Sequence, residues 1–167
     1  GYLLTEEGFY ALNPINNIWT RKRPLPDPLQ DSRRMFTFSI GDRGLVGFSY
    51  KNRNLWSYNP ETNRWSQKSS FPKDYFQESN AVLGRYMFSL GSKGYLGLSV
   101  SRFNEKSFWE YDLSSDTWTE KNPLPSDMNN SFANMIIDGN PYVGLGGNDR
   151  LGNTFGSDEI WRYDTLY

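Results

Sequence analysis

The residues best suited to chemistry lie in irregular stretches between apolar segments of the sequence. A guanidinium group holds a carboxylate through paired N–H donors, and a nearby carboxylic acid can transfer a proton. Arginine and aromatic side chains on a rigid frame are also frequent anchors for a protein or a glycan. The candidate binding residues are Arg33, Arg34, Arg53, Tyr75, Glu78, Arg102, Phe103, Asp127, Asp149, Arg150 and Phe155. For each of them, a loop charge that is merely solvated or paired within the chain is the alternative.

Composition excludes several classes of site. The chain has no Cys and no His, which removes disulfides, thiolate or imidazole metal sites and Ser/His or Cys/His catalysis. Asp- and Asn-rich loops follow no recognised calcium pattern, so we expect no metal and no cofactor. With 18 basic and 19 acidic residues, no broad attraction to nucleic acid or to an anionic membrane is expected. No window approaches eighteen apolar residues, so no membrane span is expected either.

A repeated stretch organises the chain. Residues 55–65 have relatives at 9–19 and 108–118, and a truncated fourth copy occurs at 160–164. In each full copy a Trp follows ten residues after the leading apolar residue, and a Pro follows seven residues later. The copies start 46, 53 and 52 residues apart. A period of this length, with short strands and turns, predicts the blades of a propeller.

Between the copies, the sequence predicts hairpins with glycine at the turns. The paired strands are expected at 35–40 with 45–50, at 85–90 with 95–100, and at 133–137 with 141–147. Each of the second strands has an internal glycine (Gly47, Gly97 and Gly144), which would let a neighbouring strand or side chain approach closely. A full unit therefore has four strands, named a to d here. We expect a partial blade at 1–26, blades at 35–72 and 81–125, and a partial blade at 132–167.

This pattern resembles kelch repeats, which build β-propellers. The resemblance rests on strand c as aromatic-x-Tyr-Asn/Asp, the four-residue turn, the Trp and the closing Pro. It implies an all-β propeller segment of four-stranded antiparallel blades, two complete and two partial. The double glycine of kelch strand b is present only at Gly146-Gly147. Relatives of the galactose oxidase type need a Tyr–Cys cross-link and His ligands, so copper oxidase activity is excluded for this segment.

The tryptophans are expected to fill the spaces between blades. Trp56, Trp109 and Trp161, with Tyr10 in the first copy, would form one layer between blades, and a second layer would hold Trp19, Trp65 and Trp118. Each buried aromatic contributes on the order of 2–3 kcal/mol. Because the first copy lacks strand a and the last lacks strand d, we expect the ring to be completed by missing chain, a second copy or a partner. The start at Gly1 indicates a processed form or an excerpt.

Antiparallel blades place the d-to-a and b-to-c connections on one face of the disc, which we call the loop face. These connections, at 27–34, 73–79, 126–131, 51–54, 101–107 and 148–159, are longer and more varied than the turns opposite, as binding loops tend to be. We expect a non-catalytic scaffold that binds a protein or a glycan there. The alternative is a sugar-acting propeller enzyme such as a sialic-acid mutarotase or a sialidase-like protein, with Arg33, Arg34 and Glu78 as its components. The composition favours an exported bacterial protein.

Overall fold

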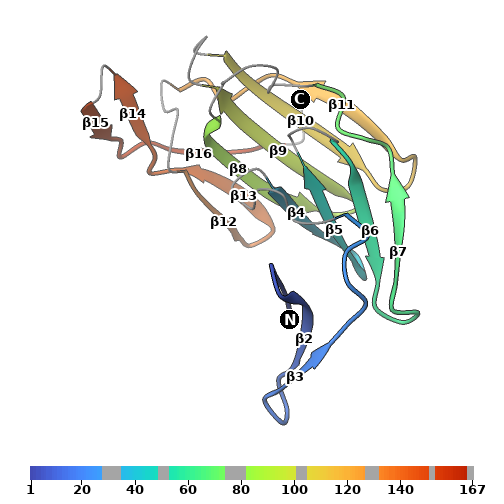
Figure 1. Ribbon diagram of the computed structural model, residues 1–167. Coiled ribbons are helices and arrows are strands. Elements are labelled where there is room, and N and C mark those ends of the chain that lie inside the picture. Colours follow the sequence, from blue (N-terminus) through green and yellow to red (C-terminus); the bar gives the residue numbers. More distant parts are fainter. Residues whose placement is uncertain are drawn as a thin grey trace.

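The chain folds into antiparallel β-sheets that follow one another along the sequence (Figure 1). The computed structural model describes residues 1–27, 35–48, 53–73, 82–100, 105–126, 132–150 and 153–164. Within this part of the chain, no helix is long and apolar enough to cross a membrane.

Four sheets carry most of the strands. The first has the order β1 (Tyr2–Thr5), β2 (Gly8–Asn13), β3 (Ile18–Arg21). The second has the order β4 (Met35–Ile40), β5 (Arg43–Phe48), β6 (Leu55–Asn59), β7 (Arg64–Lys68). The third has the order β8 (Val82–Leu90), β9 (Lys93–Val100), β10 (Glu105–Asp112), β11 (Thr117–Lys121). The fourth has the order β12 (Ala133–Ile137), β13 (Asn140–Gly144), β16 (Ile160–Arg162).

A fifth, two-stranded element lies where the sequence predicted only a loop. The connection from β13 to β16 contains the hairpin of β14 (Gly147–Arg150) and β15 (Asn153–Gly156). Strand β13 ends at Gly144, three residues earlier than expected, and the chain then enters this hairpin. In the described residues, the first sheet has no strand equivalent to β4 or β8, and the fourth has none equivalent to β7 or β11. The blade bounds given above stay a prediction.

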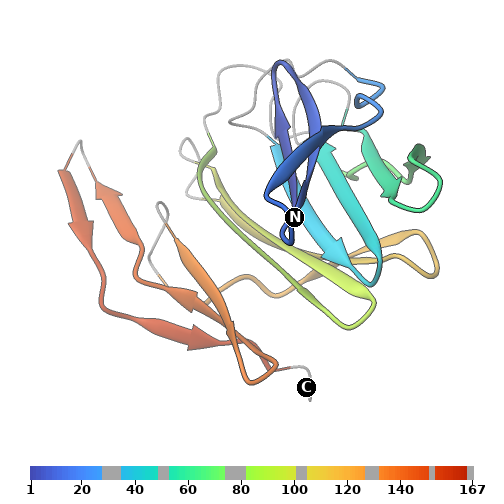
Figure 2. The same ribbon diagram turned by 90° about the horizontal axis from the view of Figure 1, so that it is seen from below.

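The sheets pack face to face, with their first strands closest together. Strand β4 contacts β8, and β8 contacts β12. Figure 2 shows the sheets succeeding one another in chain order, from the blue first sheet to the orange fourth. One apolar core lies between the second and third sheets, and it includes Phe36, Phe71 and Tyr111. A second core lies between the third and fourth sheets, around Tyr86 and Phe108.

Two of the three internal glycines, Gly47 and Gly97, fit under aromatic rings, whereas a Cβ added to Gly144 would lie 2.2 Å from the backbone oxygen of Glu159 on the neighbouring chain segment. Phe36 pairs with Gly47 across β4 and β5, and a Cβ added to Gly47 would lie 2.2 Å from the Phe36 ring. Tyr86 and Gly97 repeat the arrangement, with a distance of 2.0 Å. The ring therefore folds down across its own sheet, because the partner residue has no side chain.

Neighbouring sheets are joined by a repeated set of hydrogen bonds, which we call the Asx–Trp clamp. Trp65 Nε1 donates to the backbone oxygen of Arg23 at 2.9 Å, and Asn63 Oδ1 accepts from the Arg23 N–H at 3.0 Å. The same Asn63 oxygen accepts from the Tyr58 hydroxyl at 3.0 Å. Asn63 has a φ of 51°, a conformation that Asn and Asp tolerate better than most residues.

The clamp recurs one sheet further along the chain. Trp118 Nε1 donates to Ser69 O at 3.0 Å, and Asp116 Oδ1 accepts from the Ser69 N–H at 2.9 Å. Asp116 also accepts from the Tyr111 hydroxyl at 2.7 Å and has a φ of 56°. Each clamp thus holds the segment that leaves the last strand of the preceding sheet.

The predicted division of the tryptophans into two layers is wrong. Trp109 in β10 and Trp118 in β11 both contact the Phe71 ring, at centroid distances of 5.5 and 5.1 Å. They share one interface because Tyr111 pairs directly with Trp118, and Trp109 lies two residues before Tyr111 on the same face. The outermost tryptophans are less buried than expected: Trp19 is 48% exposed and Trp161 is 36% exposed.

We expect Gly47→Ala to lower the free energy of unfolding by about 1–3 kcal/mol, because the new methyl group would overlap the Phe36 ring. Urea unfolding followed by tryptophan fluorescence measures this change. Gly44→Ala is the matched control in the same strand, since an added Cβ there meets nothing within 4 Å. A change under about 1 kcal/mol is expected for the control. Equal effects of the two variants would contradict the packing argument.

We expect Asp116→Gly to destabilise the protein by about 1–3 kcal/mol, because the Ser69 N–H and the buried Tyr111 hydroxyl lose their acceptor. Glycine keeps the positive φ, so the change removes the hydrogen bonds without backbone strain. Asp138→Gly is the control, since Asp138 has a φ of 50° in an exposed turn. Thermal unfolding that is equally affected in both variants would show that the clamp adds nothing.

Candidate binding surface

Most of the predicted binding residues lie outside the described part of the chain. These are Arg33, Arg34, Tyr75, Glu78, Arg102, Phe103 and Asp127. Three others lie on the projecting hairpin, where Asp149 pairs with Thr154 and Phe155 with Asn148, while Arg150 pairs with Asn153. Figure 1 shows this hairpin extending away from the stacked sheets. Only the backbone of these three residues is described.

Arg53 is the one predicted binding residue whose side chain is described. Its Nη1 donates to the backbone oxygen of Pro72 at 3.0 Å, and its own carbonyl accepts from the Phe71 N–H at 2.9 Å. The residue has a φ of 52°. Arg53 therefore joins the start of β6 to the segment that follows β7. The alternative of a structural loop charge fits Arg53 better than a free anchor does.

A carboxylate fixes the base of the loops between the first and second sheets. Asp27 Oδ2 accepts from Trp56 Nε1 at 2.7 Å and from Asn54 Nδ2 at 2.8 Å. Asn54 in turn accepts from Gln67 at 3.2 Å. The start of a d-to-a connection and the end of a b-to-c connection are therefore held together by side chains from two sheets.

A second carboxylate has the same role between the third and fourth sheets. Glu159 Oε2 accepts from the Ser126 hydroxyl at 2.5 Å and from Trp161 Nε1 at 3.2 Å. The Lys106 ammonium group donates to the backbone oxygen of Ser126. Hydrogen bonds from Ser126 and Trp161 lower the pKa of the Glu159 carboxyl, so it is ionised at neutral pH. Tryptophan of strand c thus reaches a carboxylate at both ends of the stack.

Among the described residues, the most enclosed charge lies elsewhere, on the flank of the third sheet. Glu110 is 7% exposed, and it accepts hydrogen bonds from Lys93 Nζ at 2.7 Å and from the Tyr95 hydroxyl at 2.8 Å. Lys121 Nζ lies 3.6 Å away. These residues and Tyr163 line a hollow of about 400 Å³ between the third and fourth sheets.

The environment of Glu110 keeps it charged. Burial raises the pKa of the Glu110 carboxyl, but the hydrogen bonds from Lys93 and Tyr95 and the charge of Lys121 outweigh burial, so the pKa falls below 4.5. Burial and the bond to Glu110 raise the pKa of Tyr95 well above 10.0. Near neutral pH the pair is therefore an ionised acid beside a protonated phenol, and neither group is close to its titration point.

Sequence reasoning missed Glu110, although a signal was present. The equivalent residue in the second sheet is Ser57, whose side chain is also buried. A Glu between Trp109 and Tyr111 interrupts an aromatic strand, and only partners from β9 and β11 make it tolerable there. Those partners, Lys93 and Lys121, are ordinary surface lysines when the sequence is read alone.

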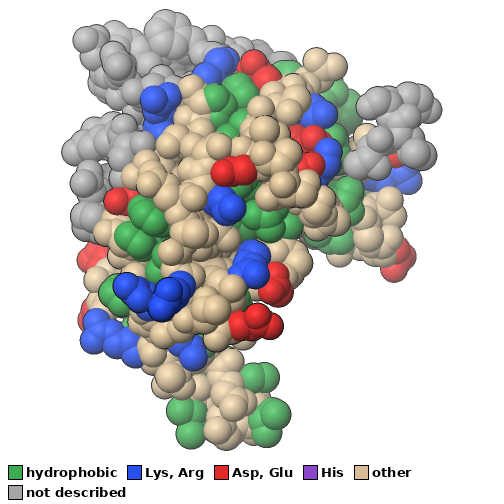
Figure 3. Space-filling model, turned by 90° about the vertical axis from the view of Figure 1, so that its right-hand side faces the viewer, with side chains coloured by type: hydrophobic (Ala, Val, Ile, Leu, Met, Phe, Trp, Pro, Cys, Tyr) green, Lys and Arg blue, Asp and Glu red, His purple; other side chains and the backbone are tan. Residues whose placement is uncertain are grey.

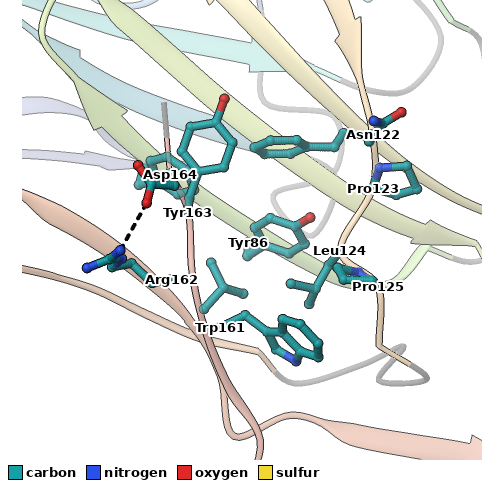
Figure 4. A pocket seen from close by; sticks show the side chains of 12 residues that line it. Tyr86, Asn122, Pro123, Leu124, Pro125, Trp161, Arg162, Tyr163 and Asp164 are labelled. Atoms are coloured by element: carbon teal, nitrogen blue, oxygen red, sulfur yellow. Dashed lines mark hydrogen bonds and ion pairs between the residues drawn. The ribbon is translucent and has the colours of Figure 1, made fainter. Parts of the chain in front are cut away.

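A pocket of about 190 Å³ opens between the third and fourth sheets (Figure 4). Tyr86 forms part of its wall, and Leu124 and Trp161 face each other across it. The salt bridge from Arg162, the last residue of β16, to Asp164 is 2.9 Å long and lies beside the pocket.

Among the described residues, no group of three or more acidic side chains is placed to hold a metal ion. Figure 3 shows basic and acidic side chains both present over another side of the molecule.

Comparison with solved structures confirms the arrangement of the sheets. The structure of YjhT superimposes with a TM-score of 0.58 over 89% of this chain and 55% of that one, at 16% sequence identity. Kelch-like protein 25 of Xenopus tropicalis is 25% identical over 141 residues, or 81% of this chain. The fold is that of a kelch-type β-propeller segment. The predicted all-β fold class is therefore confirmed.

The sequence similarity covers only a small part of each Kelch-like protein. Kelch-like protein 22 of Homo sapiens is 28% identical over 99 residues, or 56% of this chain. The kelch segment spans 22% of the length of Kelch-like protein 25 and 15% of that of Kelch-like protein 22. No protein-family model matches the sequence.

We expect Glu110→Gln to lower the free energy of unfolding at pH 7 by about 1–3 kcal/mol, because Lys93 loses the opposite charge and one of the two acceptor oxygens that bind Lys93 and Tyr95 becomes an NH2 group. Since folding lowers the pKa of Glu110, its stabilising effect is present above pH 4.5 and is lost as the pH falls through the lower pKa of the folded state. The difference between wild type and variant should therefore shrink below pH 4.5, as measured by urea unfolding at a series of pH values.

Glu120→Gln is the control for this experiment. Glu120 pairs with Lys73 at 3.2 Å, but its side chain is half exposed. We expect its effect to stay within about 1 kcal/mol and to depend little on pH. A gap between wild type and Glu110→Gln that stays constant down to pH 3 would contradict the role given to the Glu110 charge.

Proposed function

We propose that this protein is a non-catalytic recognition scaffold that binds a protein partner through its loop face. The observation that carries the proposal is the fixed base of the loops. Asp27 and Glu159 each tie a strand-c tryptophan to the segment that leaves the neighbouring sheet. A frame of this kind fixes the points at which the loops leave the sheets, and a rigid frame lowers the ordering cost of binding.

The hairpin of β14 and β15 adds a projecting element to the same frame. Its two strands pair over four residues each, and Asp149, Arg150 and Phe155 lie on it. Arginine and aromatic residues on a preformed hairpin are suited to a protein partner, because they combine contact area with hydrogen bonding. The similarity to two Kelch-like proteins supports a scaffold function of this class.

Glu110 and Tyr95 are not suited to general acid–base catalysis as a pair. A general acid or base needs a pKa near the working pH, and Glu110 and Tyr95 are shifted in opposite directions away from neutrality. A charged side chain with this set of partners orders the sheet that carries it. The sugar-acting enzyme is the second candidate, and its components Arg33, Arg34 and Glu78 lie outside the described residues.

The test compares capture of protein partners by two variants. One carries Arg102→Ala, Phe103→Ala, Arg150→Ala and Phe155→Ala on the loop face. The control carries Ile15→Ala, Glu61→Ala and Arg64→Ala, three exposed residues in or directly after the turns of the opposite face. We expect proteins captured by wild type to be retained by the control and lost by the loop variant, as measured by quantitative mass spectrometry and confirmed by calorimetry with purified partner.

A parallel measurement addresses the second candidate. The protein is added to the pure α-anomer of N-acetylneuraminic acid, and NMR follows the conversion to the β-anomer. We expect the uncatalysed rate. Acceleration that is lost in Glu78→Gln, or partner binding unaffected by the four loop substitutions, would contradict the proposed scaffold function.

A further inference from the structure

One buried position differs in chemistry between the third sheet and the second. Glu110 pairs with Tyr95 across β9 and β10, and Ser57 pairs with Leu45 across β5 and β6. Both Glu110 and Ser57 are buried. They are therefore equivalent residues on equivalent strands, but only the third sheet has a carboxylate at this position.

The two cations that hold the Glu110 carboxylate also have equivalents in the second sheet. Lys93 Nζ lies 2.7 Å and Lys121 Nζ lies 3.6 Å from Glu110 Oε1. Lys93 is the first residue of β9, as Arg43 is the first residue of β5. Lys121 is the last residue of β11, as Lys68 is the last residue of β7. The second sheet therefore keeps two positive charges around a position that has lost its negative charge.

The groups around this position in the second sheet have few partners of their own. Arg43 Nε lies 3.2 Å from Asp42, a residue of the adjacent turn whose side chain is 65% exposed. Within the described part of the chain, Lys68 forms no salt bridge and the Ser57 hydroxyl forms no hydrogen bond. A buried hydroxyl that lacks a partner inside the chain is suited to a partner from outside it.

A hollow of about 490 Å³ opens over these residues. Arg43, Ser57 and Lys68 line it, and Leu113, from the turn between β10 and β11, contributes to its wall. It lies beside two sheets that each have four strands. Serine has its hydroxyl oxygen where glutamate has its γ carbon, so the space that the shorter side chain leaves corresponds to a carboxylate group.

The rest of the lining suits hydroxyl groups. Asn59, Thr62 and Ser66 border the same hollow. Asn59 Oδ1 accepts from the N–H of Glu61 at 2.9 Å and of Thr62 at 3.3 Å, which leaves its amide NH2 group as a donor. The Ser66 hydroxyl donates to the backbone oxygen of Ser57 at 3.5 Å, so its own oxygen remains as an acceptor.

We propose that this hollow is a binding site for a small hydroxylated organic acid. The ligand carboxylate lies between Arg43, Lys68 and the Ser57 hydroxyl, as the glutamate carboxylate lies between its lysines in the third sheet, and it forms charge-assisted hydrogen bonds there. The ligand hydroxyl groups bind Asn59 and Ser66. The site is beside the turns opposite the loop face, so it is independent of the partner proposed above.

Calorimetry in a buffer of low ionic strength tests the ligand class with D-gluconate and sorbitol, which share a chain of hydroxyl groups and differ in the carboxylate. We expect gluconate to bind and sorbitol not to bind. Acetate, which has the carboxylate without the hydroxyl groups, should bind about tenfold more weakly than gluconate.

On the protein side, Lys68→Gln should weaken gluconate binding about tenfold or more. Lys22→Gln is the matched control, because Lys22 follows Trp19 by three residues as Lys68 follows Trp65, but it lies in the first sheet and outside the hollow. Its affinity for gluconate should equal that of wild type.

A second measurement needs no added ligand. Ser57→Glu supplies the carboxylate from the chain itself, and Ser57→Gln fills the same space without the charge. We expect Ser57→Glu to have the higher melting temperature of the two at low ionic strength, to lose this advantage in high salt, and to bind no gluconate.

Four results would overturn the proposal. They are no binding of gluconate by wild type, equal binding of gluconate and sorbitol, equal losses in Lys68→Gln and Lys22→Gln, and a melting temperature of Ser57→Glu that does not exceed that of Ser57→Gln. Sulfate that binds as tightly as gluconate would show a site for an adventitious ion only, and would also overturn it.

Discussion

The stack of sheets depends on one repeated contact, in which a tryptophan and an Asn or Asp of one sheet bind the segment that leaves the sheet before it. The indole N–H and the side-chain oxygen satisfy a backbone carbonyl and a backbone N–H that have left their own ladder. These hydrogen bonds lie at the exposed edge of each interface. In the second clamp the Trp118 ring also packs on Phe71, so the contact combines packing area with hydrogen-bond pairing at the same point.

The same contact explains which parts of the structure the sequence could predict. The spacing of Trp65 and Trp118 marked the repeat, and the glycines opposite Phe36 and Tyr86 marked a close approach across each sheet. These features are local and periodic, so one chain reveals them. The hairpin at 147–156 has no counterpart in the other copies, and periodicity could not predict it. The pairing of strand-c and strand-d tryptophans in one interface depends on strand register, which alternation alone does not specify.

The candidate site was predictable only in part for a related reason. Loop membership identified arginines and aromatics but not their partners. Arg53 lies in a predicted binding loop, yet its guanidinium is used within the chain to hold Pro72. Asp27 and Glu159 were read as loop residues, although they fix tryptophans from neighbouring strands. Whether a charged side chain binds a partner or stabilises the fold depends on its neighbours in space. For Asp27 and Glu159, these neighbours lie about thirty residues away in the sequence.

The two ends of the hairpin of β14 and β15 lie side by side where the hairpin joins the fourth sheet. Backbone hydrogen bonds join Ser157 N to Gly146 O at 2.8 Å and Leu145 N to Glu159 O at 2.9 Å, so the two ends of the insertion are held together below it. The closure entropy of a loop rises slowly with its length once its ends are fixed. The ends of this insertion can therefore hold connections of very different length with little disturbance of β13 and β16.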